Sequence, residues 1–122
     1  LLNKNKFYET LQENILEISD LKQLINNFPE KENTFIGENG VQISGGEKQK
    51  ISIARALHNN PKILLTDEFT NAIDEKSELK ILNKLKEYKE LDVFIMITHN
   101  KNLENMFNKV YEIKNRKIER IK

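Results

Sequence analysis

Three side chains suited to phosphoryl-transfer chemistry follow two short apolar runs of this 122-residue sequence. The first run, residues 63–65, leads to Asp67 and Glu68, and the second, residues 93–97, leads to His99. One carboxylate can hold Mg²⁺ while another orients or deprotonates a water molecule, as metal-assisted phosphoryl transfer requires. The alternative is that the acidic pair only begins a loop and that the histidine only caps a strand.

Both apolar runs predict strands of a parallel sheet, because each is short and unbroken, as in a strand buried on both faces. Between them, residues 74–89 predict an amphipathic helix with Asp74 as its N-cap. The apolar stripe of this helix is expected to contain Leu79, Leu82, Leu85 and Tyr88. A strand, a helix and a strand in this order form a βαβ unit, so Asp67, Glu68 and His99 are expected at one edge of the sheet. Because the three side chains are expected together, a phosphoryl-transfer site is favoured over the alternative in which the acidic pair and the histidine are unrelated loop features.

A second candidate site lies at residues 43–47, which read Ile-Ser-Gly-Gly-Glu. Ser44 followed by Glu47 is a capping-box pattern and predicts the start of a helix. The free N–H groups and the dipole of such a helix start attract anions. Gly45 and Gly46 lack the Cβ atoms that would hold a phosphate away, and Ser44 offers a hydroxyl. The alternative is an ordinary serine-capped helix whose glycines only shape the turn.

Other segments complete the expected organisation. Residues 10–28 have apolar positions three and four apart and predict a helix, which we expect Ser19-Asp20 to divide, with Asp20 capping the second part. Residues 30–42 predict a loop, and residues 59–61, Asn-Asn-Pro, end the helix that starts at Ser44. Residues 110–121 predict a terminal hairpin.

Composition excludes several classes of protein. There are 20 basic and 19 acidic residues, a net charge of 20 − 19 = +1, so no overall field favours nucleic acid. The absence of cysteine excludes disulfides and thiolate chemistry. No apolar run approaches the roughly 18 residues of a membrane span. The phosphate-binding pattern Gly-x-x-x-x-Gly-Lys-Ser/Thr does not occur in these residues.

Five segments, in order along the chain, resemble the motifs of the nucleotide-binding domain of exporter-type ABC transporters. They are the X-loop (34–40), the signature motif with the helix that follows it (43–57), the Walker B strand (63–68), the D-loop (70–74) and the switch-histidine loop (97–99). The resemblance covers most of residues 7–122. The Walker A loop, the adenine-stacking aromatic residue and the Q-loop glutamine of the family are not among these residues, so the resemblance implies the carboxyl-terminal half of such a domain.

The resemblance implies an α/β fold. Part of the parallel sheet of P-loop NTPases is expected between flanking helices, with a remnant of the helical subdomain and a C-terminal β-hairpin. Residues 1–122 would form one partial nucleotide-binding domain. About 7–58 would supply the helical subdomain, the X-loop and the signature helix, and about 59–122 would supply the core with Walker B, the D-loop, the switch histidine and the hairpin.

The resemblance also implies roles for single residues, with ATP and Mg²⁺ as the ligands. Asp67 would hold Mg²⁺ through water, Glu68 would position or activate the attacking water, and His99 would sense the γ-phosphate. The ATP of the opposite subunit would be contacted by Ser44, Gly45, Gly46 and Glu47. Glu47 stands where the family more often has glutamine. Asp74 would lie at the dimer interface.

The implied function is ATP binding and hydrolysis that power transmembrane export. The implied partners are a second nucleotide-binding domain, arranged head to tail, and a transmembrane domain that contacts Thr34–Gly40. This places the chain at the cytoplasmic face of a membrane, attached through transmembrane domains outside these residues, with no nucleic-acid partner. Two alternatives stay open: an ABC ATPase of DNA repair or chromosome organisation, and a catalytically silent module that only binds a partner domain.

Overall fold

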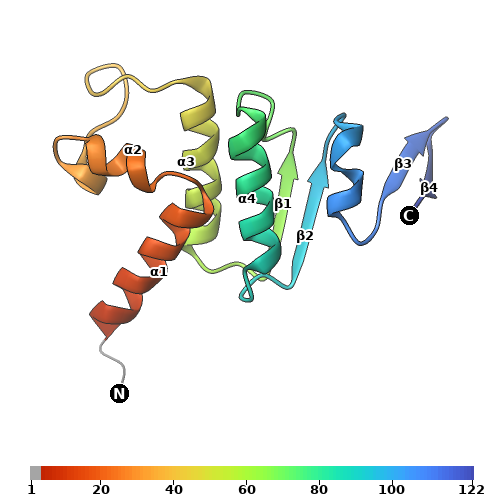
Figure 1. Cartoon of the computed structure of the whole chain (residues 1–122), viewed down its shortest axis with the longest axis horizontal. Coiled ribbons are helices and arrows are strands. Elements are labelled where there is room, and N and C mark those ends of the chain that lie inside the picture. The colour runs from red at the N-terminus through yellow and green to blue at the C-terminus, as the bar shows by residue number, and fades with distance from the viewer. Residues whose placement is uncertain (1–3) are drawn as a thin grey trace.

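The computed structural model describes residues 4–122, except for the side chains of residues 4–8 and 10. Its elements are α1 (Lys4–Ile18), α2 (Lys22–Asn27), η1 (Lys31–Asn33), α3 (Gly45–His58), β1 (Ile63–Asp67), α4 (Glu75–Glu87), β2 (Val93–Ile97), η2 (Lys101–Met106), β3 (Tyr111–Lys114) and β4 (Lys117–Arg120). Figure 1 shows the helices α1–α3 at one end, the strands β1 and β2 in the middle and the β3–β4 hairpin at the other end. The expected α/β architecture is therefore confirmed.

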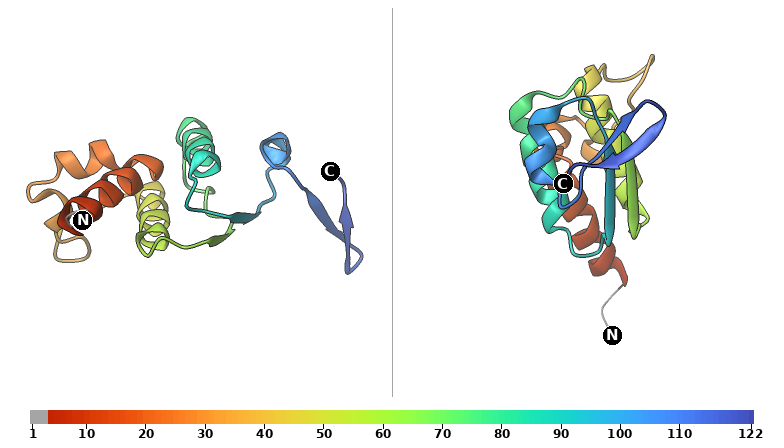
Figure 2. Two further views of the ribbon diagram at one scale, coloured as in Figure 1. Left: turned by 90° about the horizontal axis from the view of Figure 1, so that it is seen from below. Right: turned by 90° about the vertical axis from the view of Figure 1, so that its right-hand side faces the viewer.

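The strands β1 and β2 are parallel neighbours, as the strand–helix–strand order predicts. Their register pairs Ile63 with Val93 at one end and Asp67 with Ile97 at the other. The left view of Figure 2 shows α4 on one side of these strands, and no other described element of the chain covers their opposite side. The carboxyl ends of both strands consequently lie together at one edge.

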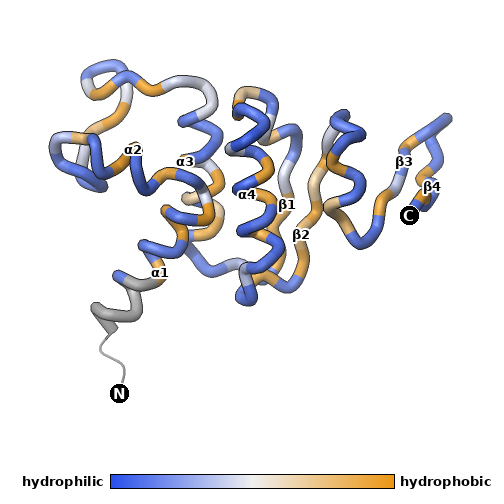
Figure 3. Tube along the Cα trace, viewed as in Figure 1, coloured by the Kyte–Doolittle hydropathy of each residue, from blue (hydrophilic) through white to orange (hydrophobic). Residues whose placement is uncertain are grey.

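The prediction that both strands are buried on both faces is wrong for this chain. Alternate side chains point away from α4, and they stay exposed because nothing in the described residues packs on them. Leu64 is 5% exposed, whereas Leu65 next to it is 65% exposed. The uncovered sheet face consists of Ile63, Leu65, Val93, Ile95 and Ile97, which are 43–65% exposed. Figure 3 shows the apolar character of both strands.

Helix α4 begins after Asp74, as predicted, because the Asp74 Oδ1 accepts a hydrogen bond from the Ser77 N–H at 2.9 Å. Its buried stripe differs from the prediction. Leu79 is 39% exposed, whereas Ile81, which the prediction omitted, is fully buried. The buried stripe contains Glu78, Ile81, Leu82 and Leu85. Successive residues of a helix are rotated by about 100°, so Leu79 points about 100° away from its buried neighbour Glu78 and lies outside this stripe.

The expected break in the first helical stretch is confirmed, but α1 begins at Lys4, earlier than residue 10. The prediction that Asp20 caps α2 is wrong, because Leu21 occupies the N-cap position and no side chain caps that helix. The Asp20 carboxylate binds Lys50 and Lys80 instead. Charge-assisted hydrogen bonds of this kind are stronger than a neutral cap bond.

The core lies between α1, α3, α4 and β1. It consists of Ile15, Ile18, Ile53, Leu57, Leu64, Ile73, Ile81 and Leu85. The predicted hairpin is confirmed, and its two turn residues, Asn115 and Arg116, have φ values of 51° and 61°. Two positive φ values are typical of the type I′ turn that suits the twist of a hairpin. No helix within the described residues is long and apolar enough to cross a bilayer.

Candidate functional site

The strand-end cluster, which we define as Asp67, Glu68 and His99, forms where β1 and β2 end. The Glu68 N–H donates to the Ile97 carbonyl at 2.9 Å, so the register of the sheet continues one residue past β1. The His99 Nε2 lies 2.9 Å from the Glu68 Oε1. The structure thus brings the carboxylate and the imidazole together, as the parallel arrangement predicts.

The Glu68 carboxylate is held by two neighbours. Its Oε1 faces His99, and its Oε2 accepts a hydrogen bond from the Asn71 Nδ2 at 2.7 Å. Glu68 also has a φ of 46°, a backbone conformation that non-glycine residues adopt rarely and that is often found at functional sites. The side chain is 37% exposed. An oriented carboxylate that solvent can reach is suited to positioning or deprotonating a water molecule.

Asp67 follows Ile63 and Leu65 in the strand alternation, so its exposed side chain lies on the same side as the uncovered sheet face. Among the described residues, no group of three or more histidine, aspartate or glutamate side chains could hold a metal ion by itself. Mg²⁺ is usually bound by one or two carboxylates together with water and phosphate oxygens. An exposed aspartate beside a second carboxylate fits a magnesium site that is completed by a bound phosphate.

The helix tip, which we define as residues 44–47, begins α3 with the predicted capping box. The Glu47 N–H donates to the Ser44 Oγ at 3.2 Å, and the Ser44 N–H donates to the Glu47 Oε2 at 2.6 Å. Ser44 and Gly45 are exposed, so the chain itself does not cover the tip. The Glu47 carboxylate is taken up by the cap, whereas the exposed Gly45 leaves its backbone open to a ligand.

The helix tip packs against the loop between β1 and α4, residues 68–74. A Cβ on Gly46 would lie 2.5 Å from the Ala72 carbonyl oxygen. The Ala72 N–H donates to the Gln49 Oε1 at 3.0 Å. Asn71 and Gln49 are polar partners that the sequence analysis missed. The position of Asn71, three residues after Glu68, could have predicted its hydrogen bond to Glu68. No sequence pattern predicts the hydrogen bond between Gln49 and Ala72.

Asp74, at the end of this loop, is exposed. Hydrogen bonds from Ser77 hold the pKa of its carboxyl below the ordinary value, so it carries a negative charge at neutral pH. No hydrogen bond or ion pair among the described residues joins the side chains of the helix tip to those of the strand-end cluster. The loop 68–74 contacts the helix that carries the tip and begins at Glu68 of the strand-end cluster, so it links the two groups.

The chain resembles known proteins of one family. A family model described as ABC transporter matches residues 3–71. Multidrug resistance protein 1 of Plasmodium falciparum is 39% identical over 123 residues, which cover 95% of this chain and 9% of that protein. ATP-binding cassette sub-family B member 5 of Mus musculus is 49% identical over 72 residues, 59% of this chain and 6% of that protein.

A solved structure described as a bacterial Atm1-family ABC exporter with ATP bound has a TM-score of 0.67 and 32% sequence identity to this chain. The match covers 77% of this chain and 17% of the exporter chain. The chain belongs to the ABC transporter family, and its fold is that of a fragment of an exporter nucleotide-binding domain. It spans at most 17% of the length of these relatives.

Proposed function

We propose that this chain is the carboxyl-terminal half of a nucleotide-binding domain that binds and hydrolyses ATP to power export by an ABC transporter. Family membership and the names of the exporter relatives support this proposal. The observation that carries it is the 2.9 Å contact between Glu68 and His99, beside Asp67, at the ends of two parallel strands. That is the place where open α/β sheets bind their ligands.

The strand-end cluster would carry out the chemical step. Glu68 accepts a proton from, or orients, the attacking water, while Asn71 and His99 hold its two carboxylate oxygens in position. Asp67 would hold Mg²⁺, and the bound ion would supply charge neutralisation at the phosphate oxygens. His99 would also sense the γ-phosphate, since its side chain is 91% exposed and a bound nucleotide can reach it.

The helix tip would act on a second nucleotide, bound to the opposite subunit of a head-to-tail dimer. Ser44 and Gly45 are exposed, and the start of α3 offers N–H groups and a positive dipole end to the γ-phosphate. Gly46 and Glu47 shape the tip, through the close approach to Ala72 and through the capping box. Asp74 would lie along the dimer interface.

A transmembrane domain would contact residues 34–40. Phe35 in this loop is 69% exposed, and Gly37 has a φ of 140°, which side chains rarely adopt. A Cβ on Gly40 would lie 2.2 Å from the Phe35 carbonyl oxygen, so this glycine allows the loop to close on itself and to present the phenylalanine. This contact would place the domain at the cytoplasmic face of a membrane.

The test uses a complete domain, in which a Walker A segment precedes these residues. We expect that domain to hydrolyse ATP and the 122 residues alone not to do so, since they contain no phosphate-cradling Gly-x-x-x-x-Gly-Lys-Ser/Thr pattern. Glu68→Gln keeps the size of the side chain but removes the base, and it should lower turnover by roughly 10²–10⁴-fold with ATP binding retained.

The matched control is Glu75→Gln, a substitution of an exposed glutamate in the first turn of α4, which should leave turnover unchanged. Two outcomes contradict the proposal. One is a complete domain that binds no ATP, and the other is a Glu68→Gln domain as active as its parent. Salt-sensitive binding of DNA by the complete domain would favour the DNA-repair alternative instead.

A further inference from the structure

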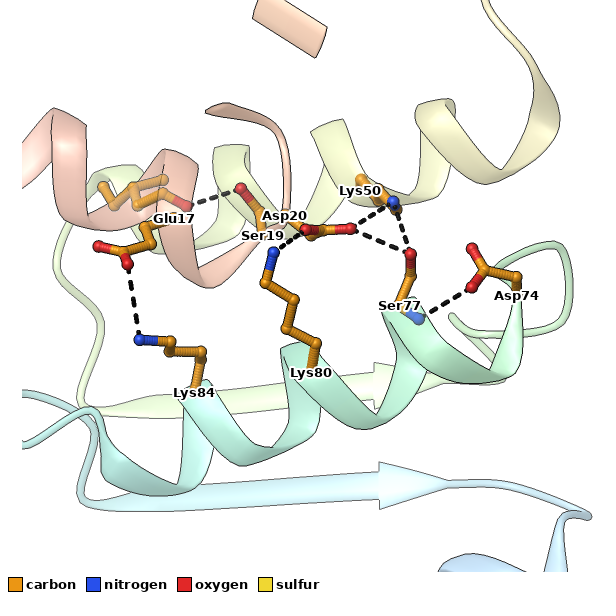
Figure 4. Close-up of polar contacts among 9 residues, drawn as sticks. Glu17, Ser19, Asp20, Lys50, Asp74, Ser77, Lys80 and Lys84 are labelled. Atoms are coloured by element: carbon orange, nitrogen blue, oxygen red, sulfur yellow. Dashed lines mark hydrogen bonds and ion pairs between the residues drawn. The ribbon is translucent and has the colours of Figure 1, made fainter. Parts of the chain in front are cut away.

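A polar cluster away from the strand-end cluster joins the turn between α1 and α2 to the helices α3 and α4, and Figure 4 shows its members. Its centre is Asp20, in the turn between α1 and α2. The Asp20 Oδ2 accepts hydrogen bonds from the Lys50 Nζ of α3 at 2.7 Å and from the Ser77 Oγ of α4 at 3.0 Å. The Lys80 Nζ of α4 donates to the other carboxylate oxygen. One carboxylate thus binds side chains from two helices that are distant in the sequence.

Ser77 extends this cluster to the loop before α4. Its Oγ also accepts from the Lys50 Nζ at 3.0 Å, and its backbone N–H donates to the Asp74 Oδ1 at 2.9 Å. Lys50 lies one helical turn after Glu47, the last residue of the helix tip. A continuous set of hydrogen bonds therefore runs from the helix that carries the tip, through Asp20 and Ser77, to Asp74.

The cluster is partly shielded from water, so its charges interact more strongly than surface charges do. The side chains of Asp20 and Lys50 are 20% and 15% exposed. Burial raises the pKa of Asp20, but the hydrogen bonds from Lys50, Lys80 and Ser77 outweigh it and lower the pKa to about 2. Without the carboxylate, Lys50 would remain partly buried without its counter-charge.

We propose that Asp20 is a positioning residue that fixes the helix tip and the loop 68–74 in one relative geometry. Asp20 touches neither site, so it acts through Lys50 on the helix of the tip and through Ser77 on the loop. The contacts of Ala72 with Gly46 and Gln49 join the same two segments directly. The functional consequence rests on the proposed function, in which the tip and the strand-end cluster serve two nucleotides.

The experiment is hydrogen exchange on the complete domain, in which a Walker A segment precedes these residues, with ATP turnover as a second readout. Three amides, which we call the junction, report on the geometry. The Glu47 N–H donates to Ser44 within the tip, the Ala72 N–H donates from the loop to Gln49 of α3, and the Ser77 N–H donates to Asp74 at the end of the loop. Asp20→Asn keeps the size of the side chain and tolerates the φ of 55°. We expect exchange in peptides that contain these amides to rise by roughly tenfold, which corresponds to ~1.4 kcal/mol of local opening. Turnover should fall by a similar factor.

Exchange in β1 is the internal standard, because a general loss of stability would accelerate exchange there as well. Glu17→Gln is the matched control. Glu17 also links α1 to α4, through Lys84 at 3.6 Å, but this pair involves no residue of α3. A second variant, Ser77→Ala, removes the hydroxyl and keeps the backbone N–H that donates to the Asp74 Oδ1, so it should raise exchange at the junction to a smaller extent.

Unchanged exchange at the junction in both Asp20→Asn and Ser77→Ala would overturn the inference. An equal effect of Glu17→Gln would also overturn it, because the effect would then reflect the docking of α1 alone. A failure of the proposed function would give a different result. A wild-type complete domain without ATP turnover contradicts that function, while the exchange pattern still tests the role of Asp20.

Discussion

Gly46 lies so close to Ala72 that a Cβ at position 46 would stand 2.5 Å from the Ala72 carbonyl oxygen. Real Cβ atoms do not approach backbone oxygen this closely, so a side chain here must displace the loop 68–74 or the start of α3. Gly46→Ala should therefore lower the free energy of unfolding by about 1–3 kcal/mol, as overpacking does. Denaturant titration of the complete domain measures this change.

Gly45→Ala is the control for Gly46→Ala. A Cβ on Gly45 would lie 3.5 Å from the Ala72 Cβ, an ordinary contact. Alanine also favours helix more than glycine does, so Gly45→Ala should leave stability unchanged or raise it by up to ~1 kcal/mol. Equal destabilisation by both substitutions would show that the close approach to Ala72 is not the cause.

His99→Ala should separate activity from stability. The ring is 91% exposed, so its removal should change the free energy of unfolding by less than about 0.5 kcal/mol. ATP turnover by the complete domain should nevertheless fall by roughly 10²-fold, because Glu68 loses the partner of one carboxylate oxygen. The comparison is His58→Ala, an exposed histidine in the last turn of α3, which should leave turnover unchanged.

Two substitutions at Ser44 separate its two roles. Ser44→Ala removes the acceptor of the Glu47 N–H and should cost about 1 kcal/mol of stability. Ser44→Asp keeps a good N-cap and suits the helix dipole, so stability should be retained. The added carboxylate would repel a γ-phosphate, and ATP-dependent dimerisation, measured by size-exclusion chromatography with light scattering, should be lost. Normal dimerisation of Ser44→Asp would contradict the contact between the tip and the nucleotide.

The Asp20 cluster predicts a specific pH dependence of stability. The pKa of Asp20 falls from 3.8 to about 2 on folding, so its ionised form stabilises the native state by ~2 kcal/mol above the unfolded pKa. This contribution is lost as the pH falls from about 4 through about 2. The difference in unfolding free energy between wild type and Asp20→Asn should therefore shrink across that interval.

Chemical denaturation at several pH values, with the denaturant concentration at the midpoint as readout, tests this dependence. Asp92→Asn provides the comparison, because Asp92 is an exposed aspartate in the loop between α4 and β2. Its effect on stability should stay within about 0.5 kcal/mol throughout. A constant difference between wild type and Asp20→Asn down to pH 2 would show that the carboxylate is not held in its ionised form by Lys50, Lys80 and Ser77.

Local patterns in the sequence determined the elements that carry the candidate site. The caps at Ser44 and Asp74 depend on residues three positions apart, and such contacts form within one helical turn. The meeting of Glu68 and His99 follows from the strand–helix–strand order, because parallel strands end at the same edge. The role of these residues in catalysis remains a prediction that the turnover experiments test.

Only the tertiary structure decided contacts between segments that are far apart in the chain. Asp20 has the residue type and the position of a local cap, yet its partners lie 30, 57 and 60 residues away, and the two lysines among them outcompete a local cap bond. The exposure of Leu65 and Ile95 likewise depends on which elements reach the sheet. An apolar run indicates that a strand is suited to burial, but the packing of helices that are distant in the sequence decides which face of the strand is covered.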